Sequence, residues 1–322
     1  MKPKIYVTRK LEACVKEKLE MYCEVSMWGR EDLPVPKEVL MKEVSQVEGL
    51  YCLLTETIDK EIISLAPNLK VISNMAVGYN NIDLEEAKKH SIIVTNTPPD
   101  ILTETTADLT FALLMATARR IVEAVDYIKT NQWLTWSPPM QLTGRDIYGA
   151  TLGIIGMGRI GSALARRAKG FKMNVVYHNR NRRPRHEKEL GVHYLEWEEL
   201  LKTSDYICVL VPYSEETKNL IAEKEFSLMK DTCILINTSR GGIVKEDALY
   251  HALTNQQIWA AGLDVFEQEP IDSTNRFVSL PNVVTLPHIG SASVETRLKM
   301  EEVAAKNLLR VLQDKPPLYR VV

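Results

Sequence analysis

A glycine-rich turn, Gly156-Met-Gly158-Arg-Ile-Gly161, follows the apolar run 151–155 and opens an amphipathic segment at Ser162. In such a turn the first glycine permits a tight bend, the second lets a pyrophosphate approach the backbone, and the third lets helix and strand pack closely. The N–H groups at the start of the helix favour an anion. A dinucleotide site is therefore predicted, and its expected ligand-binding residues are Gly156, Met157, Gly158, Arg159, Ile160 and Gly161.

Strand-like and helix-like segments alternate on both sides of this turn. Short runs rich in β-branched residues are separated by amphipathic segments such as 36–47, 59–66 and 84–90. Because such alternation places parallel strands between two layers of helices, an α/β protein is predicted. The pattern restarts at Thr151 in a chain of 322 residues, which indicates two doubly wound parallel sheets. The expected strands are Ile5–Thr8, Glu24–Trp28, Gly49–Leu54, Val71–Ser73, Ile92–Thr95, a strand starting at Thr151, Val175–His178, Tyr206–Val211, Cys233–Asn237, Ala260–Asp264 and Val283–Leu286.

Three further segments define the expected domain organisation. Pro98-Pro99 cannot continue a helix or a central strand, and the apolar stretch 103–120 is expected to form a buried helix joining two domains. A last helix, over about 294–313, lies beyond the second sheet, so the chain is expected to return to its first domain. The polar stretch 131–146 has no clear period. The expected domains are residues 1–98 with 290–322 for the substrate, and residues 99–289 for the dinucleotide.

The composition argues against several classes of protein. Lys and Arg number 40 against 42 Asp and Glu, so the formal charge of −2 provides no basic field for nucleic acid. The five cysteines form no Cys-x-x-Cys pair and no histidine has metal-ligand spacing, so no metal site is expected. No apolar stretch reaches the roughly 18 residues of a membrane span, and the N-terminus lacks a signal-peptide core. We expect a cytoplasmic protein that binds neither nucleic acid nor membrane.

The residues after the second strand of the dinucleotide-binding sheet bear on the choice of cofactor. An acidic residue about 20 positions after the glycines would hydrogen-bond the ribose of NAD, but the strand at 175–178 is followed by Asn179-Arg-Asn-Arg182. Asn179 can donate a hydrogen bond, and Arg180, with Arg182 nearby, can bind a 2′-phosphate bidentately. NADPH is therefore predicted. The alternative is NADH, bound without the acidic contact while the arginines form a solvated turn.

Three reactive side chains follow three later strands. Arg240 precedes a Gly-Gly pair, Glu269 precedes a proline, and His288 lies in a Pro-His-Ile-Gly turn. Because ligands of a doubly wound sheet bind at the carboxyl ends of its strands, all three side chains are expected to face one crevice. The Gly-Gly pair would let the backbone approach a ligand. Position alone does not distinguish Glu269 from the neighbouring Glu267.

With these residues in place, the chain resembles the D-isomer-specific 2-hydroxyacid dehydrogenase family over nearly its whole length. It looks most like the glyoxylate and hydroxypyruvate reductase branch of that family. The resemblance implies a Rossmann domain inserted into a flavodoxin-like substrate domain, and an NADPH-dependent reduction of a small 2-keto acid to the D-2-hydroxy acid. The motifs that carry it are Val77-Gly-Tyr-Asn-Asn-Ile-Asp83, Thr106-Ala-Asp-Leu-Thr-Phe-Ala-Leu-Leu, Gly156–Gly161, Asn237–Gly241, Gly262-Leu-Asp-Val-Phe-Glu-Gln-Glu-Pro270 and Pro287-His-Ile-Gly-Ser.

The resemblance also implies a mechanism that elementary chemistry supports. Arg240 would bind the substrate carboxylate and polarise the keto oxygen, because a guanidinium fork can serve both. His288 would donate a proton to the developing alkoxide, and Glu269 would hold the imidazole. Backbone N–H groups around Val77 and Gly78 would bind the other side of the carboxylate, as a nest does.

Further positions follow from the resemblance alone. Thr106 is expected near the nicotinamide, Asp264 at its carboxamide and Pro212 on the adenine side, with Thr238 and Gly290 completing the cofactor contacts. In the matching branch, the helix 103–120 and the stretch Trp133–Pro138 contribute to a homodimer interface, and the residue matching Trp136 reaches the neighbouring active site. A homodimer is therefore expected, unless both tryptophans are local packing residues of one subunit.

Two other functions remain open at this point. A 2-ketogluconate reductase of the same family is a close rival, because related bacterial enzymes share the Tyr-His-Asn-Arg ending of the strand at 175–178. From a different class, the same fold serves as an NAD(P)-sensing transcriptional corepressor. The long tails and the acidic NAD contact of that group do not occur here, which favours the enzyme.

Overall fold

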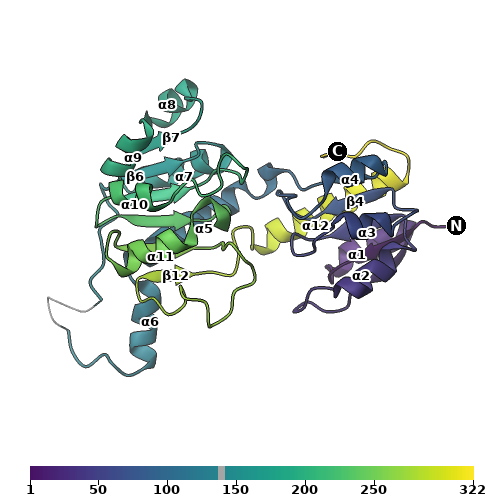
Figure 1. The fold of residues 1–322 in the computed structure, drawn as a ribbon, viewed down its shortest axis with the longest axis horizontal. Coiled ribbons are helices and arrows are strands. Elements are labelled where there is room, and N and C mark those ends of the chain that lie inside the picture. Colours follow the sequence, from purple (N-terminus) through teal and green to yellow (C-terminus); the bar gives the residue numbers. More distant parts are fainter. Residues whose placement is uncertain (137–141) are drawn as a thin grey trace. The chain divides into compact units, whose positions relative to one another are not determined.

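The computed structural model describes residues 1–136 and 142–322 of the chain (Figure 1). The chain divides into two compact units. Unit 1 consists of Met1–Ile101 and Ala292–Val322, and unit 2 of Leu102–Ser291. In both units the strands that pair are parallel, as the alternation of strand and helix predicts.

Unit 1 has a five-stranded sheet in the order β2-β1-β3-β4-β5. This is the flavodoxin-like order. β1 lies inside the sheet, and the strand order reverses between β1 and β3. The strands are β1 (Lys4–Val7), β2 (Glu24–Met27), β3 (Gly49–Cys52), β4 (Val71–Asn74) and β5 (Ile93–Thr95). The helices are α1 (Ala13–Tyr22), α2 (Lys37–Val44), α3 (Lys60–Ser64), α4 (Leu84–Lys89), the short 3₁₀ helix η1 (Pro99–Ile101) and α12 (Val294–Leu312).

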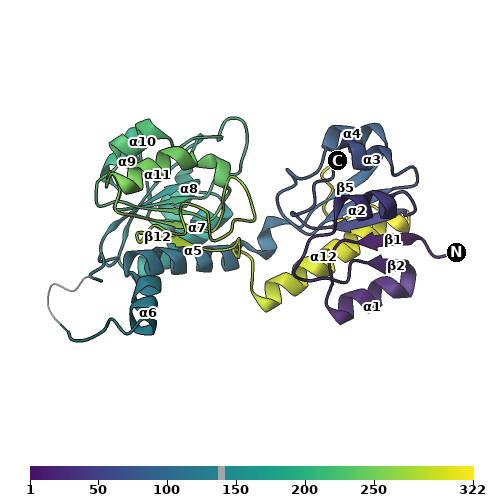
Figure 2. The ribbon, with the colours of Figure 1, turned by 60° about the horizontal axis from the view of Figure 1, so that its bottom comes forward.

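Helices cover both faces of this sheet, so its central strands are buried along their length instead of alternating. Every residue of β3 and β4 is buried. The C-terminal helix α12 packs on β4, β3 and α1, with Ala304, Ala305 and Leu308 fully buried, and both views show it beside the sheet (Figures 1 and 2). Ser293 caps it by accepting the N–H of Thr296 at 3.3 Å.

Unit 2 has a seven-stranded sheet in the order β12-β11-β10-β9-β6-β7-β8. Strand order reverses at β6, between β7 and β9, and such a switch point is where open α/β sheets bind ligands. The strands are β6 (Thr151–Ile155), β7 (Asn174–His178), β8 (His193–Tyr194), β9 (Tyr206–Val209), β10 (Ile234–Asn237), β11 (Ala260–Leu263) and β12 (Val283–Thr285). The helices are α5 (Thr103–Ala118), α6 (Ile121–Lys129), α7 (Arg159–Gly170), α8 (Pro184–Leu190), α9 (Trp197–Thr203), α10 (Glu223–Leu228), the 3₁₀ helix η2 (Gly241–Ile243) and α11 (Glu246–Thr254).

The predicted fold class, two doubly wound parallel sheets with a Rossmann-type unit, is confirmed. The sequence pattern predicted neither β8 nor α6. It also placed the end of the buried helix at residue 120, whereas α5 ends at Ala118 because Arg120 adopts a left-handed backbone (φ 53°) that starts α6 in a new direction. Among residues 1–136 and 142–322, no helix is both long enough and apolar enough to cross a membrane.

Candidate active site

The glycine-rich turn of unit 2 has the geometry of a phosphate cradle. Gly156 has a φ of 107°, and a Cβ there would lie 2.6 Å from the carbonyl oxygen of Leu210. A Cβ at Gly161 would lie 2.3 Å from the carbonyl oxygen of Gly156, so helix α7 can approach the turn only through glycine. A Cβ at Gly158 would meet nothing within 4 Å, which leaves open space beside the backbone. The turn therefore fits a dinucleotide pyrophosphate.

The side chain at position 157 serves packing. Met157 is fully buried among the apolar residues beneath the sheet, and its backbone N–H donates to Oδ1 of Asn179 at 2.6 Å. That hydrogen bond ties the end of β7 to the glycine-rich turn, so Asn179 uses its carbonyl oxygen within the protein. The remaining turn positions lie at the surface or half-buried: Gly158, Arg159 and Ile160.

The two arginines after β7 differ in their surroundings. Arg180 forms an exposed ion pair with Glu216 at 2.7 Å. Arg182 instead donates twice to Glu187, at 2.8 and 2.7 Å, and this hydrogen bonding lowers the pKa of Glu187 to about 2. Arg182 is thus held by its neighbours, whereas Arg180 has only a solvent-screened partner, and such a pair contributes little stability.

Glu269 and His288 form the central pair of the site. Nδ1 of His288 lies 2.6 Å from Oε2 of Glu269, and Oε1 of Glu269 accepts the N–H of Phe266 at 2.9 Å. Burial raises the pKa of Glu269, but the His288 hydrogen bond, the Phe266 N–H and the charge of Arg240 outweigh it, leaving that pKa below its ordinary 4.5. Glu269 is therefore ionised at neutral pH, so Nδ1 donates and Nε2 faces away from the carboxylate.

Asp264 holds the turn that carries the histidine. Its Oδ1 accepts the N–H of Ile289 at 2.8 Å, directly after His288, which has the left-handed φ of 55°. Its Oδ2 is buried and has no hydrogen-bond partner among the described residues. Burial raises the pKa of Asp264. A buried acceptor without a donor is costly, and the carboxamide N–H₂ of a nicotinamide is a donor of the kind it lacks.

Residues predicted to surround the nicotinamide lie near this carboxylate. A Cβ at Gly290 would lie 3.3 Å from Oδ2 of Asp264 and 3.5 Å from Cγ2 of Thr106, so Gly290 lies directly beside both side chains. Thr110, which the sequence analysis missed, donates to the carbonyl of Thr106 at 2.7 Å and lies 2.7 Å from the hydroxyl of Thr238. Thr110 could have been identified from its position one helical turn after Thr106, on the same face of the helix.

Arg240 lies half-buried at the end of β10. Asn237 donates to its carbonyl at 2.9 Å, and one guanidinium nitrogen donates to the carbonyl of Ser239 at 2.7 Å. Burial lowers the pKa of Arg240, while the nearby charge of Glu269 opposes that shift. The guanidinium keeps further donors for a ligand.

The glycine after Arg240 has a different role from the predicted one. A Cβ at Gly241 would lie 1.9 Å from the carbonyl carbon of Phe266, so the close approach is made by the protein's own backbone and not by a ligand. A Cβ at Gly242 would lie 2.9 Å from the ring of Tyr213. Gly241 thus lets the loop after β10 pack against the loop after β11, which carries Glu269.

The remaining predicted residues lie in separate surroundings. Pro212 is exposed after β9, and its carbonyl accepts the hydroxyl of Thr217 at 2.7 Å. In unit 1, Val77 and Gly78 are half-buried in the turn that follows β4. Trp136 is 73% exposed; the residues next to it, Ser137 and Pro138, lie outside the described part of the chain.

Comparison with known proteins agrees with this geometry. Residues 111–290 match the model of the family described as D-isomer specific 2-hydroxyacid dehydrogenase, NAD binding domain. The chain belongs to the D-isomer-specific 2-hydroxyacid dehydrogenase family. The predicted family is thus confirmed, and with it an oxidoreductase that uses a nicotinamide cofactor and a 2-keto or 2-hydroxy acid.

Members of the 2-hydroxyacid dehydrogenase family match the chain from end to end. Glyoxylate reductase of Korarchaeum cryptofilum is 49% identical over 98% of this chain and 95% of its own length. The crystal structure of the TT0316 protein from Thermus thermophilus has a TM-score of 0.91 and 42% identity, covering 99% of this chain and 100% of that one. An NADPH-dependent glyoxylate/hydroxypyruvate reductase from Sinorhizobium meliloti, solved with NADP and malonate, has a TM-score of 0.84 and 33% identity over 100% and 97% of the chains.

Proposed function

We propose that this dehydrogenase reduces glyoxylate or hydroxypyruvate to the corresponding D-2-hydroxy acid, with NADPH as the preferred electron donor. The observation that carries the proposal is the 2.6 Å hydrogen bond between His288 and Glu269, formed beside Arg240 at the ends of adjacent strands. The relatives named glyoxylate reductase support the choice of substrate.

Each member of the catalytic group has a distinct proposed role. Arg240 binds the substrate carboxylate and polarises the keto oxygen, since several of its donors remain available. Because Nδ1 of His288 is engaged by Glu269, Nε2 delivers the proton to the oxygen as negative charge develops there. Backbone N–H groups around Val77 and Gly78 bind the other side of the carboxylate. The reduced nicotinamide, when bound, supplies the hydride to the keto carbon.

The cofactor-binding roles are proposed on the same basis. The glycine-rich turn binds the pyrophosphate, and Asp264 with Thr106, Thr238 and Gly290 surrounds the nicotinamide. Pro212 lines the adenine side. Arg180 binds the 2′-phosphate, because its ion pair with Glu216 is exposed and a phosphate competes well for a guanidinium.

A homodimer is proposed from the surface of helix α6. This helix has no buried residue, and Ile121, Val122, Val125 and Ile128 are each 45 to 60% exposed. Both views show α6 set apart from the sheet of unit 2 (Figures 1 and 2). Trp133 and Trp136 are also exposed, which supports a role for them at an interface. A second copy of the chain would cover these side chains, and Trp136 would then reach the partner's substrate.

The direct test is the oxidation of NADPH, followed at 340 nm with glyoxylate, hydroxypyruvate and 2-ketogluconate in turn, and repeated with NADH. We expect turnover with the first two acids and a higher kcat/KM with NADPH. His288→Ala should lower kcat by roughly a hundredfold or more while NADPH still binds. Turnover with 2-ketogluconate alone would transfer the proposal to that substrate, and near-native activity of His288→Ala would exclude the mechanism.

NADPH binding without turnover of any keto acid would favour a nucleotide-sensing protein. That outcome would also remove the proposed role of His288, because a sensor needs no proton donor.

A further inference from the structure

We propose that Asn74 and Asn96 are positioning residues for the substrate carboxylate. Their side-chain amides hold two carbonyl groups of the turn Val77–Tyr79, termed here the 77–79 turn, so that its N–H groups are presented to a ligand. The proposal rests on the function proposed above, in which this turn binds the carboxylate of a 2-keto acid.

The hydrogen bonds to the 77–79 turn determine the orientation of its peptide planes. Nδ2 of Asn96 donates to the carbonyl of Val77 at 2.8 Å, and Nδ2 of Asn74 donates to the carbonyl of Gly78 at 3.0 Å. In a planar trans peptide the N–H points opposite to the C=O. Holding these two carbonyls therefore aims the N–H groups of Gly78 and Tyr79 away from the two asparagines.

Those N–H groups are left for a ligand. Among the described residues, the structure gives no acceptor to the N–H of Gly78 or of Tyr79. Gly78 is half-buried and Tyr79 is 40% exposed. Successive backbone N–H groups of a turn can form a site suited to an anion, and a carboxylate would satisfy both donors.

Asn74 is itself held in one orientation. Its side chain is fully buried at the end of β4, its Oδ1 accepts the thiol of Cys52 at 3.6 Å, and its Nδ2 also donates to Oδ1 of Asn81 at 3.2 Å. An amide flip would place donors against the donor thiol and an oxygen against two oxygens, which costs the full hydrogen-bonding energy of each group. The donor to Gly78 is thus fixed.

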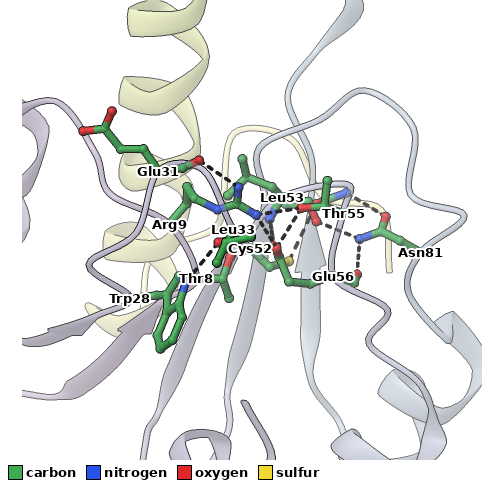
Figure 3. A network of polar contacts seen from close by, with 11 residues as sticks. Thr8, Arg9, Trp28, Glu31, Leu33, Cys52, Leu53, Thr55, Glu56 and Asn81 are labelled. Atoms are coloured by element: carbon green, nitrogen blue, oxygen red, sulfur yellow. Dashed lines mark hydrogen bonds and ion pairs between the residues drawn. The ribbon is translucent and has the colours of Figure 1, made fainter. Parts of the chain in front are cut away.

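A buried carboxylate joins this arrangement to the neighbouring strand ends. Nδ2 of Asn81 donates to the carbonyls of Leu53 and Glu56, both at 3.0 Å (Figure 3). Glu56 is only 4% exposed and accepts the Thr8 hydroxyl at 2.7 Å and the Arg9 guanidinium at 3.1 Å. The loops after β1, β3 and β4 therefore form one hydrogen-bonded frame that supports the 77–79 turn.

Asn96 is held by residues from the C-terminal part of the chain. Its backbone N–H donates to the carbonyl of Tyr319, and its carbonyl accepts Nδ2 of Asn307 in α12, both at 3.3 Å. The C-terminal helix and the segment after it thus position Asn96 from residues far along the sequence. The two asparagines reach the turn from different strand ends, so each can be tested without removing the other.

The experiment compares Asn96→Asp and Asn74→Asp with the unaltered enzyme. Each change keeps the shape of the side chain but replaces the donor with an acceptor. We expect KM for glyoxylate and the inhibition constant of oxamate to rise about tenfold, or about 1.4 kcal/mol. We expect kcat and KM for NADPH to stay within about threefold, because uniform binding and not the chemical step is weakened.

Thr97→Val is the matched control. Thr97 is buried next to Asn96, its hydroxyl has no hydrogen-bond partner among the described residues, and its N–H bonds the carbonyl of Ala76. This variant should keep every kinetic constant. If Asn74→Asp does not fold, the more exposed Asn96→Asp decides the matter alone.

The outcomes separate this inference from the proposed function. No turnover of any keto acid by the unaltered enzyme would remove the proposed function and the inference with it. Turnover by the unaltered enzyme with unchanged glyoxylate KM and oxamate inhibition in Asn96→Asp would overturn the inference alone. An equal loss of kcat and of NADPH affinity, together with a lowered Tm, would also overturn it, because a merely structural role predicts that pattern.

Discussion

At the scale of single residues, the site depends on a histidine held from two sides. Glu269 binds its Nδ1, while Asp264 binds the N–H of the next residue, Ile289. The left-handed φ of His288 is uncommon for a residue with a side chain and is found where the surroundings over-determine it. The imidazole therefore presents Nε2 without needing to be ordered by substrate.

Glu269→Gln tests this arrangement. We expect kcat to fall by roughly a hundredfold, because the amide can bind Nδ1 in the wrong tautomer. Glu267→Gln is the control, since Glu267 accepts the N–H of Glu246 at 2.9 Å and should leave kcat unchanged. Equal losses in the two variants would contradict the assignment of Glu269.

The same variant has a pH signature in stability. The pKa of Glu269 is lower in the folded protein than its ordinary 4.5, so its ionised form stabilises the fold above that pH. This contribution is lost as pH falls through the folded pKa. The Tm difference between the unaltered protein and Glu269→Gln should thus be largest near neutrality and shrink below about pH 4.5. A difference that grew on acidification would contradict the pKa direction.

The proposed preference for NADPH also rests on single residues. Asn179→Asp combined with Arg180→Gln should lower the NADPH/NADH ratio of kcat/KM by about tenfold or more, since it removes a charge-assisted phosphate contact and adds a ribose acceptor. Asp at 179 can still accept the Met157 N–H, so the turn should keep its shape. Arg185→Gln, which removes an exposed arginine paired with Glu189, is the control. An unchanged ratio in the double variant would refute the assignment of Arg180.

At the scale of elements, helix α6 carries apolar residues that packing within unit 2 does not bury. Its apolar residues recur at helical spacing, yet none is buried. An apolar stripe with nothing against it is unfavourable in water and marks an interaction surface.

Val125→Glu combined with Ile128→Glu should convert the proposed dimer into monomers in sedimentation. Both side chains are exposed in the subunit, so the fold itself should tolerate the change. Asp126→Lys, an exposed charge change off the apolar stripe of α6, should leave the association state unaltered. A subunit that sediments as a monomer before any substitution would refute the dimer.

Element boundaries illustrate what sequence pattern can and cannot predict. Apart from β8, the strands of both sheets were predicted to within a few residues, because buried parallel strands are short apolar runs. The edge strand β8 has only two residues, and α6 is short, so neither produced a clear period. The end of α5 depends on the left-handed backbone of Arg120. An arginine in the sequence does not predict that conformation, as a glycine would.

At the scale of the whole molecule, the residues proposed for function follow the carboxyl ends of the strands in each sheet. In unit 1 the frame around Glu56 connects loops after β1, β3 and β4. In unit 2 the glycine-rich turn follows β6, Asn179 follows β7, and Arg240, Glu269 and His288 follow the last three strands. Parallel strands bring all their carboxyl ends to one edge, so residues far apart in sequence meet there.

The family, the fold class and the residues proposed for catalysis could all be predicted from the sequence. These properties depend on local patterns: the spacing of glycines, the period of apolar residues, and reactive side chains directly after strands. Sequence reasoning even selected Glu269 over Glu267, although only through the family pattern.

Only the tertiary structure decided which groups hold the reactive ones in place. Gly241 packs against Phe266 and not a ligand, Asp264 bonds Ile289, and Asn96 is held by Asn307, 211 positions away along the chain. The physical reason is that a hydrogen bond depends on distance and direction in space, and an asparagine at a strand end has no sequence pattern that names its partner.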